Sequence, residues 1–182
     1  MRKVLTIPNI ISMFRLALIP FFVVSYFLGA NNESFLHLSI GIVLLSGLSD
    51  VADGFIARKF NMISDLGKVL DPIADKLTQA SVMLCLAFMH PIAIFPMFGV
   101  LFVKELLTLF VAVHLLSSGT KPISSKWFGK ISTLAIFFTM VYALFVDLFG
   151  ISEIPLYILS GVSIVCMVVS ALGYSKLFYK HV

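Results

Sequence analysis

The sequence predicts an all-α integral membrane protein with six transmembrane helices and both termini in the cytoplasm. Of its 182 residues, 60% are hydrophobic and only 12% are charged, and the mean hydropathy is +1.07. A soluble domain of this size could not cover so much apolar surface with polar groups. The apolar residues gather into six runs, and the basic residues gather beside alternate connections between them, which is the pattern that orients a membrane protein.

Six segments are long enough to cross a bilayer, which takes about 20 apolar residues for about 30 Å of hydrocarbon. They run approximately from Asn9 to Ala30, Phe35 to Arg58, Asp65 to Met89, Pro91 to Ser117, Trp127 to Phe149, and Pro155 to Phe178. The connections are short and contain turn residues such as Gly29 and Pro122. We therefore expect residues 1–182 to form a single six-helix domain, with residues 1–8 as a short juxtamembrane segment.

The first span lies where a signal peptide would lie, but we expect it to be retained. It is too long for a signal-peptide core, it lacks a clear small-x-small cleavage site, and another apolar segment follows at once.

The positions of Lys and Arg predict the orientation. Nearly all of them lie at the chain ends or around the second and fourth connections: Arg2, Lys3, Arg15, Arg58, Lys59, Lys68, Lys76, Lys121, Lys126, Lys130, Lys176 and Lys180. The first, third and fifth connections contain none. By the positive-inside rule both termini are cytoplasmic. The net charge of +4 therefore reflects topology, and no nucleic-acid partner is expected. His90, in the third connection, is expected to be solvated.

Four acidic residues lie inside two of these spans, where charged groups are costly and by default mark a functional site. Asp50 and Asp53 are i, i+3 near the cytoplasmic end of the second span, and Asp71 and Asp75 are i, i+4 near the start of the third. Each pair shares one helix face. At 1.5 Å per residue, Asp50 lies roughly 12 Å, and Asp75 roughly 15 Å, from the cytoplasmic end of its span. The four carboxylates can therefore meet in a cavity open to the cytoplasm.

Four close carboxylates repel one another and need compensating positive charge. Ligands that are all oxygen favour Mg²⁺, Mn²⁺ or Ca²⁺ over zinc. Two such ions a few Å apart form the clamp used in phosphoryl chemistry. We therefore expect Asp50, Asp53, Asp71 and Asp75 to bind two divalent cations.

The residues around the aspartates suit a bound phosphate compound. Gly54, Ala57 and Gly67 are small and allow a helix or a ligand to approach closely. Arg58 ends the second span, where a guanidinium can hold a phosphate with two hydrogen bonds. Pro72 is expected to disturb the third helix and free a carbonyl group.

Read in order, these residues form a signature of eight positions: Asp50, Asp53, Gly54, Ala57, Arg58, Gly67, Asp71 and Asp75. This signature resembles that of the CDP-alcohol phosphatidyltransferase family at every position and spacing. A second segment, with Pro8, Asn9, Ser12 and Arg15, resembles the family's Pro-Asn-x-x-Ser/Thr-x-x-Arg motif. The family is similar in having six spans, and the resemblance implies a homodimer.

The resemblance also implies roles for these residues. Asp50, Asp53 and Asp71 would bind two Mg²⁺ or Mn²⁺ ions, while Asp75 would complete the metal site and act as general base. The residues expected to border the CDP-linked lipid are Asn9, Arg15, Asp53, Gly54, Ala57, Arg58 and Gly67. CDP-diacylglycerol would be the donor, with its acyl chains among the membrane lipids. The hydroxyl of a small polar alcohol would attack its phosphorus from the cytoplasmic side, and CMP would leave.

Two further segments bear on the acceptor. Lys104-Glu105 resembles the Arg-Glu pair of phosphatidylglycerophosphate synthases, and residues 129–133 resemble their Gly-Lys-x-Lys-Thr, with Ser132 in place of the second Lys. Lys104 and Lys130 would then hold the phosphate of glycerol 3-phosphate. The same segments resemble cardiolipin synthases, whose acceptor is phosphatidylglycerol. Inositol phosphate, inositol and serine also remain open.

A hypothesis from another class is a cation transporter that uses intramembrane aspartates. A transporter places its acidic residues near mid-membrane with access from both sides, whereas here they gather toward one face beside Arg58. The sequence therefore favours the transferase.

Overall fold

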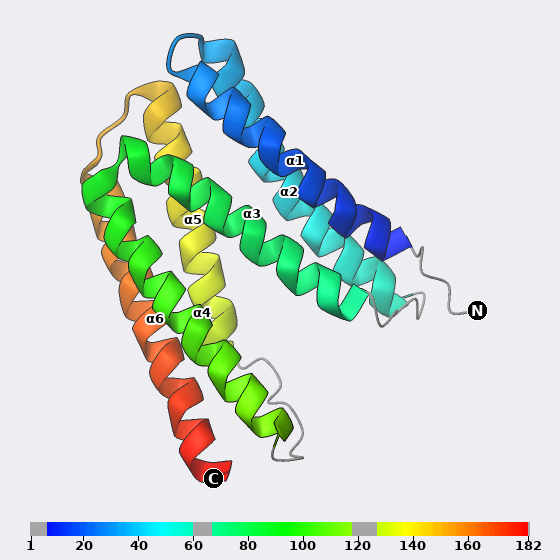
Figure 1. Ribbon diagram of the computed structural model, residues 1–182. Helices are drawn as coiled ribbons and strands as arrows, with labels where there is room; N and C mark the ends of the chain where they lie inside the picture. Colours follow the sequence, from blue (N-terminus) through cyan, green and yellow to red (C-terminus); the bar gives the residue numbers. More distant parts are fainter. Residues whose placement is uncertain (1–6, 60–66, 118–126, 182) are drawn as a thin grey trace. The chain divides into compact units, whose positions relative to one another are not determined.

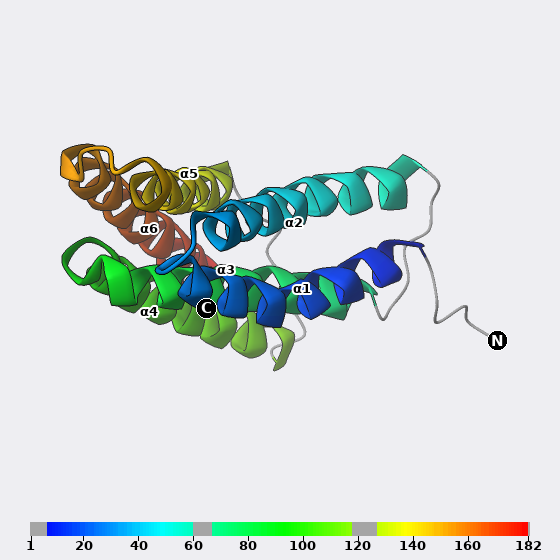
Figure 2. The ribbon, with the colours of Figure 1, turned by 90° about the horizontal axis from the view of Figure 1, so that it is seen from above.

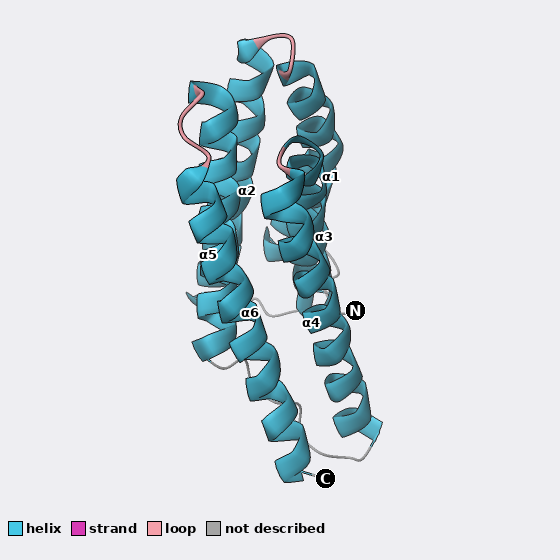
Figure 3. Cartoon of the chain, turned by 90° about the vertical axis from the view of Figure 1, so that its left-hand side faces the viewer, coloured by secondary structure: helices cyan, strands magenta, loops and turns pink. Residues whose placement is uncertain are grey.

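The protein is described here from a computed structural model, which places residues 7–59, 67–117 and 127–181. These residues form six α-helices: α1 (Ile7–Gly29), α2 (Glu33–Lys59), α3 (Gly67–Met89), α4 (Pro91–Ser117), α5 (Trp127–Phe149) and α6 (Ile154–His181). Within these three ranges there is no strand (Figure 3). The prediction of an all-α chain with six helices is confirmed for this part of the sequence.

The helix bounds follow the predicted spans closely. α4 and α5 begin and end at the predicted residues, and every other bound lies within three residues of its prediction. α3 runs unbroken through Pro72, so the expected disturbance does not end the helix. That proline lies five residues after the helix begins, so the missing N–H removes one hydrogen bond near the end and leaves the rest of the ladder intact.

Four of the described helices contain stretches that are long and apolar enough to cross a membrane. These stretches are Asn9–Gly29, Pro91–Val111, Gly129–Phe149 and Ile154–Gly173. α2 and α3 carry the aspartates, which lower their hydropathy. The long apolar helices identify an integral membrane protein.

The chain divides into two compact units, residues 1–85 and 86–182. In the first unit, α1 and α2 lie side by side and antiparallel (Figures 1 and 2). Gly29 suits their close approach, because a Cβ there would make a tight contact, 3.2 Å from the Cα of Leu36. On α1, the buried rings of Phe22 and Tyr26 stack with centroids 5.6 Å apart. α1 is therefore firmly packed on the C-terminal side of the polar residues in its first turns.

In the second unit, α6 packs against both α4 and α5. The hydroxyl groups of Thr139 and Ser163 lie 2.8 Å apart and join α5 to α6. Polar pairs of this kind hold helices together in lipid, where apolar contact alone gives little preference. α5 ends at Phe149. The next residue, Gly150, has a positive φ of 59°, which glycine adopts without strain, and its N–H donates to the Val146 carbonyl at 2.9 Å.

His90 joins α3 to α4 and is not solvated as expected, since only 6% of its side chain is exposed. Its Nε2 lies 2.9 Å from Asp147 Oδ1, and its Nδ1 lies 3.5 Å from Glu153 Oε1. Tyr157 donates to Glu153 at 2.8 Å. We call His90, Asp147 and Glu153 the His90 clamp. The hydrogen bond to Asp147 raises the pKa of His90.

Candidate active site

The acidic residues of the signature lie on two helices of the first unit. Asp50 and Asp53 lie toward the end of α2, and Asp71 and Asp75 lie within the first turns of α3. The side chains of Asp50, Asp71 and Asp75 are described, whereas that of Asp53 lies outside the described side chains. The site can therefore be built from three of the four carboxylates.

Arg15 of α1 connects two of these carboxylates. Its Nη1 donates to Asp50 Oδ1 at 2.9 Å and also to Asp75 Oδ1. The Arg15 side chain is 2% exposed, while each of its two partners is 47% exposed. The prediction that carboxylates of the second and third spans meet is confirmed for Asp50 and Asp75. The positive group between them is the Arg15 guanidinium. From the sequence, Arg15 was expected to bind the phosphates of the CDP-linked lipid instead.

Ser12 lies one turn before Arg15 on the same face of α1 and donates to Asp71 Oδ1. It is fully buried. The sequence analysis matched Ser12 to a motif but gave it no role. The i, i+3 spacing of Ser12 and Arg15 could have indicated that Ser12 belongs to the site, because residues three apart lie on the same face of a helix.

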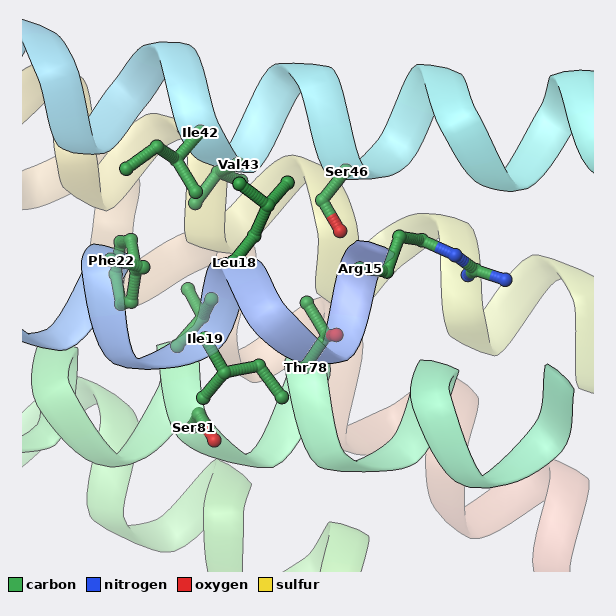
Figure 4. Close-up of a pocket in the computed structure, with 10 residues that line it drawn as sticks. Arg15, Leu18, Ile19, Phe22, Ile42, Val43, Ser46, Thr78 and Ser81 are labelled. Atoms are coloured by element: carbon green, nitrogen blue, oxygen red, sulfur yellow. The ribbon is translucent and has the colours of Figure 1, made fainter. Parts of the chain in front are cut away.

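A small, open pocket lies beside Arg15, between α1, α2 and α3 (Figure 4). Arg15, Ser46 and Thr78 form its polar end. Thr78 Oγ1 is buried and has no hydrogen-bond partner among the described residues. The rest of the lining is mainly apolar: Leu18, Ile19, Phe22, Ile42, Val43 and Val82, with Ser81. This apolar surface on the inner side strengthens the attraction between Arg15 and its carboxylates, since charges interact more strongly away from water.

The donor chemistry fits a hard divalent cation, because every acidic side chain of the signature offers oxygen. Asp50, Asp71 and Asp75 each bond α1 through Oδ1. Among the described side chains, no three His, Cys, Asp or Glu residues converge tightly enough to hold a metal ion. The expected metal ligands also include Asp53, whose side chain is not among those described.

The other residues expected at the CDP-lipid lie on the same three helices. Asn9 is buried on α1, and Gly67 is buried at the start of α3. Gly54, Ala57 and Arg58 lie in the last turns of α2, but their side chains are outside the described set.

The two expected acceptor residues belong to the second unit. Lys104 of α4 is 8% exposed in its side chain, and its Nζ lies 3.2 Å from Glu105 Oε1, as their neighbouring positions had suggested. Lys130 is exposed in the first turn of α5. Ser132, which stands where the synthase motif has Lys, is fully buried.

Comparison with known proteins decides the family. The family described as CDP-alcohol phosphatidyltransferase matches residues 5–172, which include both helical units and the complete signature. The chain belongs to the CDP-alcohol phosphatidyltransferase family. Members of this family are enzymes that transfer substituted phosphate groups.

Individual relatives of this phosphatidyltransferase differ in their names. It is 36% identical to a cardiolipin synthase (CMP-forming) of Streptomyces coelicolor, over 78% of this chain and 64% of that protein. It is 44% identical to a CDP-diacylglycerol–glycerol-3-phosphate 3-phosphatidyltransferase of Wigglesworthia glossinidia brevipalpis, over 40% of this chain and 39% of that one. The chain thus spans less than two thirds of these two relatives. A CDP-diacylglycerol–glycerol-3-phosphate 3-phosphatidyltransferase of Aquifex aeolicus is 28% identical to this chain over 98% of both proteins.

Proposed function

We propose that this phosphatidyltransferase transfers the phosphatidyl group of CDP-diacylglycerol to glycerol 3-phosphate and releases CMP, as a step of phospholipid biosynthesis. The observation that carries the proposal is the convergence of Asp50 and Asp75 on Arg15 within a chain whose family profile covers residues 5–172. The acceptor is supported by the Aquifex relative, which aligns over 98% of both chains and bears that activity in its name.

In this reaction the acceptor hydroxyl oxygen bonds to the phosphorus of the lipid donor. Asp75 takes the hydroxyl proton, and the phosphorus–oxygen bond to the CMP group breaks, so that CMP leaves with the electron pair. Asp75 is suited to this role because half of its side chain is exposed while Arg15 holds one of its oxygens, leaving the second oxygen for a proton.

Asp50, Asp53, Asp71 and Asp75 would hold two divalent cations, Mg²⁺ or Mn²⁺. Such cations would neutralise charge that develops on the phosphoryl and leaving oxygens. Asn9, Arg58 and the small residues Gly54, Ala57 and Gly67 would border the CDP group. Lys104 and Lys130 would hold the phosphate of the acceptor.

The proposed topology has six spans, with both termini and the site on the cytoplasmic side of a bacterial plasma membrane. It follows from the Lys and Arg distribution, and it requires α2 and α3 to span the membrane with their aspartates facing protein or water. The proposal includes a homodimer.

A second candidate keeps the chemistry and changes the acceptor to phosphatidylglycerol, which would give cardiolipin. It is favoured by the Streptomyces relative and by Ser132, which removes a cation from the segment expected to hold a phosphate.

One assay separates these candidates. Purified protein in lipid vesicles receives CDP-diacylglycerol with one acceptor at a time: glycerol 3-phosphate, phosphatidylglycerol, inositol 3-phosphate, inositol or serine. We expect CMP release and a phosphatidylglycerophosphate product with the first. Faster turnover of phosphatidylglycerol would establish the second candidate, and no CMP release with any acceptor would refute the transferase proposal.

A further inference from the structure

We infer that Ser12 and Arg15 are positioning residues, which orient the site aspartates of α2 and α3 and leave one oxygen of each for ligands. The inference rests on the proposed function and deepens it. It differs from the sequence-based expectation that Arg15 binds the phosphates of the CDP-lipid.

The contacts form a two-rung ladder between α1 and α3. Ser12 bonds Asp71, and Arg15 bonds Asp75. The rise from Ser12 to Arg15 is about 4.5 Å and that from Asp71 to Asp75 about 6 Å, so the two spacings match closely enough for both rungs to form. The order of the rungs is the same on both helices. This ladder fixes where α3 presents its carboxylates relative to α1.

Arg15 adds the second helix to this arrangement. The same Nη1 reaches Asp50 of α2 at 2.9 Å, so the carboxylates of two helices are held at hydrogen-bonding distance from one nitrogen. A mobile pair of acids would repel, and a fixed guanidinium offsets that repulsion. With its side chain 2% exposed, Arg15 acts from inside the protein, whereas its partners remain half exposed on the side where a ligand would arrive.

The helix that carries Ser12 and Arg15, α1, is held firmly by buried aromatic side chains. Phe22 and Tyr26 anchor α1 about two to four turns farther along, both only 2% exposed. Residues that orient a site need such support, because displacements of about 0.5 Å already matter for metal and substrate geometry. Each described carboxylate of the site uses Oδ1 for α1. These bonds to α1 fix the position of each carboxylate in the site.

The first test uses Ser12, whose replacement removes the hydrogen bond to Asp71 without changing the net charge of the site. Mn²⁺ binding is measured by electron paramagnetic resonance on detergent-purified protein without substrate. We expect Ser12→Ala to bind Mn²⁺ at least threefold more weakly, and Ser12→Thr, which keeps the hydroxyl, to bind as the wild type does. Ser25→Ala is the matched control, because Ser25 is also buried on α1 but bonds the Phe22 carbonyl. A change of less than threefold in Ser12→Ala would overturn the role of Ser12.

The second test separates positioning from substrate binding at Arg15. We expect Arg15→Gln to lower kcat at least tenfold while the KM for CDP-diacylglycerol stays within threefold, and Arg15→Lys to recover part of kcat. If the larger change falls on KM, Arg15 contacts the substrate and the inference is wrong. Should Arg15→Gln fail to fold, Arg15→Lys is subject to the same comparison. Wild-type CMP release tests the proposed function by itself, and the Mn²⁺ measurement needs no substrate, so the two failures are distinguishable.

Discussion

Arg15 Nη1 lies 2.9 Å from Asp50 Oδ1, which places a buried cation of the first helix against an acid of the second. The same nitrogen bonds Asp75 of α3. Charged groups inside a membrane protein are tolerated when they pair with one another, and Arg15 pairs with both Asp50 and Asp75. The predictions that follow depend on this arrangement.

Replacement of Asp75 by Asn is expected to impair chemistry and spare donor binding. The amide cannot accept the hydroxyl proton, and loss of a general base typically lowers the rate about 10²–10⁴-fold. Turnover and CDP-diacylglycerol binding are measured on the same preparation. Glu153→Gln, which neutralises a half-exposed acid of the His90 clamp, serves as control. Near-normal turnover by Asp75→Asn would remove Asp75 from the role of base.

Activity is expected to require a divalent cation. With Asp53 in the site as proposed, four acidic side chains would need more positive charge than Arg15 supplies, and their oxygens would suit Mg²⁺ or Mn²⁺. Excess chelator should abolish CMP release, and added Mg²⁺ or Mn²⁺ should restore it. Asp53→Asn should raise the metal concentration needed for half-maximal activity. Full turnover in excess chelator, with no metal bound to the protein, would exclude the two-metal proposal.

The His90 clamp predicts a pH dependence of stability that is separate from catalysis. The pKa of His90 is raised by its hydrogen bond to Asp147. Stabilisation by protonated His90 is therefore complete below its unfolded pKa of about 6.5 and is lost as pH rises through the higher folded value. The thermal midpoint of the wild type should fall over that interval, and that of His90→Gln should change less.

Two variants separate the partners within the clamp. Asp147 is 17% exposed and Glu153 is 50% exposed, and solvent weakens the second ion pair more. At pH 6, Asp147→Asn should therefore destabilise the protein by about 1–3 kcal/mol, and Glu153→Gln by less. Equal midpoints for the wild type and Asp147→Asn at this pH would contradict a stabilising clamp.

The sequence predicted the features that depend on short segments. The bounds of α4 and α5 follow from apolar runs between turn residues, and the acidic signature lies within 26 residues, from Asp50 to Asp75. Its two halves meet because the helices that carry them are adjacent in the chain. Spacing along the helix predicted that Asp71 and Asp75 share one face, and both bond α1.

The partners of these residues could not be predicted in the same way. Arg15 lies 35 residues from Asp50 and 60 from Asp75, and His90 lies 57 from Asp147. Such pairs depend on how helices pack, and no local pattern records that packing. His90 was misassigned because a turn at a helix end is usually solvated, whereas here the α5–α6 connection covers it.

Lys104 provides the most demanding test of the acceptor. Its ammonium is buried on α4 and pairs with Glu105 at 3.2 Å, and a buried cation of this kind can bind a phosphate dianion through a charge-assisted hydrogen bond worth about 1.5–3 kcal/mol. Lys104→Met should therefore raise the KM for glycerol 3-phosphate at least about tenfold, since 1.4 kcal/mol corresponds to a factor of ten. The KM for CDP-diacylglycerol should remain within about twofold, because this residue is assigned to the acceptor alone.

Lys104→Arg is the matched control, because it keeps the charge and restores the Arg-Glu pair of phosphatidylglycerophosphate synthases. It should retain the use of glycerol 3-phosphate. Lys130→Met should act in the same direction but more weakly, since Lys130 is exposed and water screens its charge. An unchanged KM in Lys104→Met, or a wild type that prefers phosphatidylglycerol or inositol, would show that the phosphate pocket is wrong while leaving the aspartate site and the transferase chemistry intact.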